Sequence, residues 1–216
     1  MGFLDAVFGG GKKLKGPAPD RLFAMTTAYV TMQTAYGIES AGAAGLVFQP
    51  LATADFEQIL KDAEELLHGT AEEAGSTLES ADDEYGYRWV ILRDPDFEDL
   101  VVSLNTISTE LQAGGYGDRL LCAVFAFEDT NAKHSASMPN PSRNAKHSAS
   151  MPNPSQGRRI YFIYNLKRGA FYPFVPAPGE QQHDSERELR LKAQLDKELP
   201  IEPELTRWFP LWEIPL

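Results

Sequence analysis

The sequence predicts an α+β fold, in which a mainly antiparallel sheet is built from ββα-type units and carries its helices on one face. Two observations support this prediction. Segments rich in β-branched and aromatic residues occur in groups of two or three, and one amphipathic helical pattern follows each group. The resulting order is ββα, ββα, βββα. Groups of strands separated by single helices are typical of antiparallel sheets that helices cover on one side.

The boundaries of the elements follow from apolar periodicity and from helix start and stop signals. The predicted strands are 27–34, 43–48, 75–80, 86–93, 119–128, 159–166 and 170–175. Helices are predicted at 54–68 and 96–113, and a last helix begins at a capping box formed by Ser185 and Glu188. Because three helices are needed to cover one face of this sheet, residues 22–216 are predicted to form a single α+β domain.

A duplicated segment interrupts this domain at 129–157. Residues 131–142 recur letter for letter as 144–155, and the block is rich in Ser, Asn and Pro without apolar periodicity. Such a composition predicts a disordered surface loop. The copies contain His134 and His147, but no Cys, Asp or Glu inside the copies completes a metal shell, so no metal site is predicted.

Residues 1–21 are predicted to form an amphipathic N-terminal segment followed by a basic linker. Its apolar face consists of Phe3, Leu4, Val7 and Phe8, and the linker carries Lys12, Lys13 and Lys15. A helix of two turns is not stable alone in water, so it needs a surface to order it. That surface is the protein's own core, another protein or a lipid headgroup layer. A frayed terminus without such a contact is the further alternative.

Composition and charge exclude several classes of protein. The net charge is −11, and most of it lies within 54–84, which would repel the phosphates of a nucleic acid. No apolar run reaches the roughly 18 residues needed to cross a bilayer, and the N-terminus lacks a secretory signal. A single cysteine, Cys122, among apolar neighbours predicts a buried thiol in a reducing compartment. We therefore expect a cytoplasmic protein.

Catalytic motifs are absent from the sequence. It contains no nucleophile elbow, phosphate loop or zinc-binding helix motif, and none of its histidines has a sequence-adjacent acid and nucleophile that would suggest a triad. We therefore predict a protein without enzymatic activity, catalytic residues or cofactor.

Two segments near the end of the sequence are unusually rich in aromatic residues. Residues 160–176 form a predicted hairpin around the basic turn Lys167–Arg168–Gly169, and 207–212 repeat its aromatic character. Either all these rings are core, or some are exposed beside the basic pair. Tyr, Trp and Arg dominate binding hot spots. The second reading predicts one partner-binding patch, made of Lys167, Arg168, Tyr172, Trp208 and Trp212.

Six segments carry a resemblance to a known family. They are Met1–Gly9, Asp20–Ala24, Tyr85–Trp89, Gly115–Cys122, Tyr164–Phe174 and Arg207–Trp212. In these segments the chain resembles the PspA-associated protein PspAB, an accessory family of the phage-shock (envelope stress) response. The resemblance extends over nearly the whole chain except 129–157, where the duplicated loop departs from the short connection expected there.

The resemblance implies a small cytoplasmic, non-enzymatic adaptor that binds PspA, a membrane-remodelling coiled-coil protein, or a companion of it. The predicted patch would then dock an acidic, apolar helical surface of PspA. The N-terminal residues Phe3 to Phe8 and the linker lysines would contact the partner or the inner face of an anionic membrane, giving a peripheral membrane location. The alternative is a small-molecule-binding or enzymatic domain with an aromatic pocket under the 159–175 hairpin.

Overall fold

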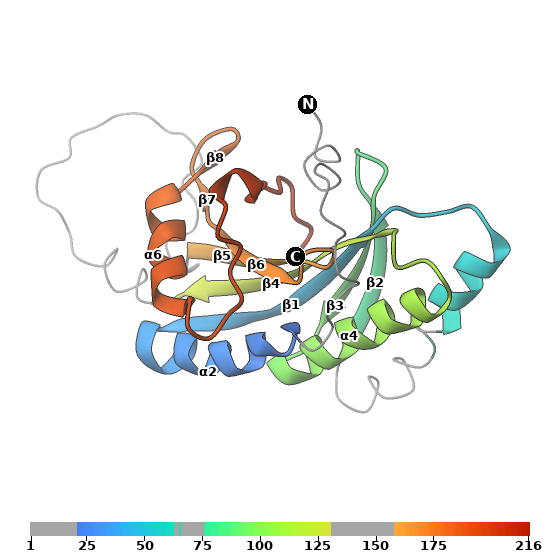
Figure 1. Cartoon of the computed structure of the whole chain (residues 1–216), viewed down its shortest axis with the longest axis horizontal. Coiled ribbons are helices and arrows are strands. Elements are labelled where there is room, and N and C mark those ends of the chain that lie inside the picture. The colour runs from blue at the N-terminus through green and yellow to red at the C-terminus, as the bar shows by residue number, and fades with distance from the viewer. Residues whose placement is uncertain (1–20, 63–64, 66–75, 131–157) are drawn as a thin grey trace, which may run out of the picture.

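A six-stranded antiparallel sheet is the centre of the computed structural model, which describes residues 21–62, 65, 76–130 and 158–216 (Figure 1). The strand order is β2-β3-β1-β4-β5-β6, and every neighbouring pair is antiparallel. The strands are β1 (Ile38–Phe48), β2 (Thr77–Asp82), β3 (Arg88–Arg93), β4 (Leu120–Asp129), β5 (Arg158–Asn165) and β6 (Ala170–Phe174). The predicted α+β class with a mainly antiparallel sheet is confirmed.

Helices cover one face of the sheet, which we call the helical face. They are α2 (Ala24–Tyr36), α4 (Phe97–Ala113), α6 (Ser185–Leu195) and a helix that includes residues 54–62. Each helix contributes apolar side chains to the same core, among them Met32, Phe56, Leu104 and Leu195. This core also contains Phe125 and Phe162 of the central strands. In Figure 1, α2 and α4 lie side by side beneath the sheet.

The predicted strand at 27–34 is wrong, because these residues belong to helix α2. Their Thr, Val and Tyr residues favour a strand locally. However, Met25, Ala28 and Met32 share one helical face and are fully buried. Gly37, with φ of 61°, ends the helix in the left-handed conformation that glycine adopts without strain. Tertiary burial therefore overrides the local preference, and the predicted first ββα group is instead a helix, one strand and a helix.

The second face of the sheet is covered by an irregular segment, residues 208–216, which we call the C-terminal cover. Trp208, Leu211, Trp212, Ile214 and Leu216 pack against it. Figure 1 shows this part of the chain running across the sheet opposite α2 and α4. A Cβ on Gly45 would lie 3.1 Å from the Trp89 ring and 3.3 Å from Leu216, so the glycine permits this close packing over β1.

The ends of the duplicated segment meet at one point of the sheet. Asp129, the last residue of β4, pairs directly with Arg158, the first residue of β5. The predicted disorder of the copies concerns residues outside those described, as does the amphipathic start of the chain. Among the described residues, no helix has the length and apolar character required to span a membrane.

Candidate functional site

An aromatic groove on the second face is the candidate site. It lies where the edge strand β6, the start of α6 and the chain around the short helix η2 (Leu205–Arg207) meet, and it encloses about 180 Å³. The aromatic groove is lined by Tyr172, Pro173, Phe174, His183, Ser185, Glu188, Leu189, Leu205, Trp208, Phe209 and Pro210. Its walls are mainly apolar, with His183 and Glu188 as the polar part.

Two aromatic rings form one wall of the groove. Tyr172 and Trp208 stack with centroids 6.3 Å apart and planes 23° apart. The Tyr172 hydroxyl donates to the Phe209 carbonyl at 3.1 Å, and the Trp208 indole Nε1 donates to the Glu202 carbonyl at 2.9 Å. Burial raises the pKa of Tyr172 well above its usual range, so the phenol is neutral. Because both polar atoms are satisfied internally, this wall offers apolar contact.

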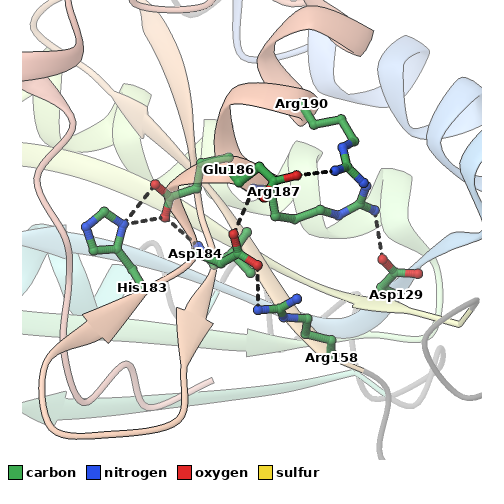
Figure 2. Close-up of polar contacts among 9 residues, drawn as sticks. Asp129, Arg158, His183, Asp184, Glu186, Arg187 and Arg190 are labelled. Carbon is green, nitrogen blue, oxygen red and sulfur yellow. Dashed lines mark hydrogen bonds and ion pairs between the residues drawn. The ribbon is translucent and has the colours of Figure 1, made fainter. Parts of the chain in front are cut away.

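His183 and Glu188 supply the polar end. The Glu188 carboxylate is 5 % exposed; its oxygens lie 2.9 and 3.0 Å from His183 Nδ1, and it accepts from the Val175 N–H at 2.9 Å. Burial raises the pKa of Glu188, and the Val175 and His183 contacts partly oppose this. Figure 2 shows His183 with its two contacts to this carboxylate.

The predicted capping box at Ser185 is wrong in its assignment of residues. The N-cap of α6 is Asp184, whose carboxylate accepts from the Arg187 N–H at 2.9 Å. Glu188 therefore has no capping role and turns instead towards His183 and β6. Asp and Ser are comparably good N-cap residues, so residue type alone does not distinguish Asp184 from Ser185.

Ion pairs attach α6 to the sheet beside the groove (Figure 2). Arg187 pairs with Asp129 at the end of β4, and Asp184 pairs with Arg158 at the start of β5, each at 2.7 Å. These contacts join the helix to both ends of the duplicated segment. The wall of the groove that α6 supplies is thus fixed independently of what lies between Asp129 and Arg158.

The outer edge of β6 is closed to another strand. Phe171 donates to the Pro200 carbonyl and accepts from the Glu202 N–H, both at 2.8 Å. Pro173 has no N–H to donate. The Val175 N–H is taken by Glu188, and the Val175 carbonyl accepts from Asp184 at 2.8 Å. A partner that binds here must therefore use side-chain contacts rather than strand addition.

The five predicted patch residues have different positions and roles in the structure. Tyr172 and Trp208 line the groove, and Tyr172 is buried. Trp212 packs edge-on against Phe174 with centroids 5.2 Å apart. The Arg168 guanidinium pairs at 2.5 Å with the buried carboxylate of Glu202. Lys167 is partly buried, which lowers its pKa.

The charge of Arg168 thus has a structural use. Glu202 is 3 % exposed and also lies 3.6 Å from the Arg207 guanidinium. This arrangement joins the β5–β6 turn to the chain around η2. The seven N-terminal residues predicted to contact a partner or membrane (Phe3, Leu4, Val7, Phe8, Lys12, Lys13 and Lys15) lie outside the described residues.

Sequence reasoning missed the residues at the mouth of the groove. Leu189 and Leu205 are 45 % and 49 % exposed and both line the groove. Leu189 falls outside the apolar stripe of its helix, whose buried leucines are Leu191 and Leu195. A leucine on the polar side of an amphipathic helix was the available signal.

The groove has a small, mainly apolar interior. No group of three or more His, Cys, Asp or Glu side chains suited to a metal ion occurs among the described residues. Cys122 is buried and its pKa is raised to about 12, as expected for an unreactive thiol. At about 180 Å³ the groove is smaller than the roughly 300–1,000 Å³ of ligand pockets. It suits one or two large side chains of a protein.

Comparison with known proteins identifies a family. The family model described as PspAB, PspA associated protein B, matches residues 1–216. No curated protein and no solved structure matches the chain significantly.

Proposed function

This chain belongs to the PspAB family, and from that premise we propose that it is a non-enzymatic adaptor of the envelope stress response that binds PspA near the cytoplasmic face of the membrane. The family description states the association with PspA. The observation that supports an adaptor is the aromatic groove beside a closed strand edge. The alternative partner of such an adaptor is a companion protein of PspA.

The geometry of the groove favours a helix as the bound element. Strand addition is blocked along β6 at Phe171, Pro173 and Val175. An amphipathic helix instead inserts apolar side chains into a groove, with anchors spaced three or four residues apart. Leu189 and Leu205 provide exposed apolar surface on either side of the aromatic walls. The proposed contact is therefore an apolar helical face of PspA, with its largest side chain in the groove.

Lys167 and Arg168 lie at the other end of β6 and extend the proposed surface. Arg168 is held by Glu202, but its side chain is still 26 % exposed. An acidic side chain of the PspA helix could contact this end, where an exposed charge acts more on the association rate than on affinity. The anchoring energy in this proposal comes from the groove.

Charge insertion at the mouth of the groove tests the adaptor proposal. Leu189→Glu and Leu205→Glu each place a carboxylate where an apolar partner side chain would pack. Co-purification with PspA from the native cell should fall at least about tenfold for each, the equivalent of about 1.4 kcal/mol. The melting temperature should stay nearly unchanged, because both side chains are already about half exposed.

Val102→Glu is the matched control. Val102 is 44 % exposed on α4, on the other side of the molecule, so it receives the same charge in a similar environment. Loss of PspA with this variant as well would indicate a general charge effect. Undiminished binding by both groove variants would remove the groove as the docking site.

The membrane part of the proposal rests on the sequence of the N-terminal segment. Phe3, Leu4, Val7 and Phe8 would enter the lipid interface, and Lys12, Lys13 and Lys15 would each add about 1 kcal/mol near an anionic surface. Flotation with anionic liposomes should recover the wild-type chain and leave a Phe3→Ser/Phe8→Ser variant behind. Equal recovery of both would argue against lipid contact by this segment.

A small-molecule or enzymatic function is the second candidate, favoured by the pairing of His183 with the buried Glu188 at an aromatic groove. In the neutral imidazole, a carboxylate at Nδ1 favours the tautomer that keeps a lone pair on Nε2. A screen for thermal stabilisation by metabolites separates this candidate from the adaptor. A metabolite that stabilises the wild type against heat but not the Leu205→Glu variant would support the small-molecule candidate.

A further inference from the structure

We propose that the chain's own N-terminal segment, residues 3–8, docks in the aromatic groove when no partner occupies it. The inference rests on the proposed function for its biological meaning, since the groove is the one assigned above to PspA. Its test uses this chain alone, so the two proposals fail separately. Sequence periodicity defines the segment, and the fold defines the groove.

The start of the described chain lies close to the groove. Arg21, the first described residue, donates from Nη1 to the Gly169 carbonyl at 3.4 Å. Gly169 is in the turn that leads directly into β6, and Tyr172 to Phe174 of that strand line the groove. The five residues of β6 span about 17 Å.

The linker is long enough to bridge this distance. Residues 9–20 can extend over about 40 Å when fully stretched, more than twice the length of β6. The segment therefore reaches every part of the groove without straining the linker. A tether of this length also holds the segment at a millimolar effective concentration, so a weak contact suffices to occupy the groove.

The chemistry of the segment matches the groove. In a helix, Phe3, Leu4, Val7 and Phe8 would share one face of two turns, and a helix this short needs a surface to order it. The groove of about 180 Å³ holds a phenylalanine ring, and Leu189 and Leu205 at its mouth are available to the neighbouring side chains. The three lysines of the linker follow this face in the sequence.

Other apolar surface of the described residues suits the segment less well. A second pocket of about 240 Å³ beside the exposed Tyr85 also has aromatic walls, but Asp82, Asp83, Glu84 and Glu213 line it too, and covering these carboxylates with an apolar face would be unfavourable. Val30 and Val102 are exposed on the outer sides of α2 and α4. They stand singly, as scattered apolar residues on protein surfaces commonly do. The groove combines an enclosed volume, aromatic walls and proximity to Arg21. It also lacks a free strand edge, so it selects the helical conformation that the spacing of Phe3 and Val7 predicts.

Self-docking would regulate the adaptor. While the segment occupies the groove, the apparent affinity for PspA falls in proportion to the fraction of molecules that remain open. Insertion of the same apolar face into a bilayer would free the groove. Membrane contact and PspA binding would then be positively coupled through one segment that has two alternative sites.

A spin label on the full-length chain tests this inference. The buried Cys122 does not compete for the label, so a nitroxide attaches to Gly2→Cys alone. The indole N–H signal of Trp208 is then recorded by NMR in labelled protein without lipid or PspA. We expect most of its intensity to be lost through paramagnetic relaxation and to be recovered when the nitroxide is reduced.

Two comparisons make the result specific. Phe3→Ser/Phe8→Ser, added to the labelled chain, should restore the Trp208 signal, and this variant changes no residue of the described core. A mixture of spin-labelled protein with unlabelled, isotope-enriched protein should show no loss, because docking is within one chain. Full Trp208 intensity in the labelled wild type, an equal loss in the serine variant, or an equal loss in the mixture would each overturn the proposal.

Discussion

The two faces of the sheet are buried in different ways. On the helical face, regular helices cover rings such as Phe48, Phe125 and Phe162, which are all 0 % exposed. On the second face, the cover is an irregular segment in which Trp208, Leu211 and Trp212 remain partly exposed. The sheet residues beneath it, such as Val124 and Ile163, are nevertheless fully buried.

This difference between the two faces indicates which of them contributes more to stability and which can bind a partner. A helix satisfies its own backbone and presents a continuous apolar stripe, so it closes a face completely. The C-terminal cover contains Pro210 and Pro215 and makes individual contacts instead, such as the Phe209 carbonyl with the Tyr172 hydroxyl. Between these contacts it leaves the aromatic groove. We therefore expect the helical face to contribute more to stability, while the second face carries the candidate binding surface.

The largest expected effect on stability comes from truncating one large side chain on each face of the sheet. Phe125→Ala, on the helical face, should lower the free energy of unfolding by about 3–5 kcal/mol. Trp212→Ala, in the partly exposed cover, should lower it by about 1–3 kcal/mol, because less apolar area leaves a buried environment. Urea denaturation of both variants measures this. Equal losses would mean that the irregular cover contributes as much stability as the helices.

Charge reversal at Arg168 should have the next largest effect. Arg168→Glu leaves the buried Glu202 beside a second carboxylate, which should destabilise the fold by about 2–4 kcal/mol. Arg190→Glu is the matched control, since the Arg190–Glu186 pair is exposed and should matter by less than about 1 kcal/mol. An unfolding free energy unchanged by Arg168→Glu would show that the Glu202 contact is dispensable.

A smaller effect is expected in the pH dependence of stability. Because burial raises the folded pKa of Glu188 above its ordinary value of 4.5, its protonated form favours the folded state. This contribution is complete below pH 4.5 and is lost as the pH rises through the folded pKa. The stability of the wild type relative to Glu188→Gln should therefore fall across that window. Denaturation at a series of pH values measures this. A difference in unfolding free energy between wild type and Glu188→Gln that stayed constant or increased with pH would contradict the prediction.

The smallest effect is expected in the duplicated segment. Deleting residues 144–155 should change the unfolding free energy by no more than about 0.5 kcal/mol, as for surface changes generally. The ends of the segment pair directly, Asp129 with Arg158, and both are tied to α6. Thermal unfolding of the shortened chain measures this. A much lower melting temperature would show that a copy packs on the fold.

Local patterns predicted most of the regular elements correctly. Helix α4, which runs from Phe97 to Ala113 with Asp96 as its N-cap, agrees with the predicted helix at 96–113. The aliphatic and aromatic residues of β4, β5 and β6 also predicted strands there, and the groove lies beside β6. Helix α2 was mistaken for a strand, because Thr, Val and Tyr carry a strand preference that only the burial of Met25 and Met32 overrides.

The sequence by itself determined the α+β class, the burial of Cys122, the aromatic hairpin and the family, because these depend on composition, on periodicity over short windows and on distinctive segments. Only the tertiary structure decided what the aromatic residues do. It placed residues 205–210 beside β6, moved Glu188 from a predicted cap to His183, and assigned Arg168 to Glu202. These contacts join residues far apart in the chain or depend on side-chain direction, and neither spacing nor propensity encodes them.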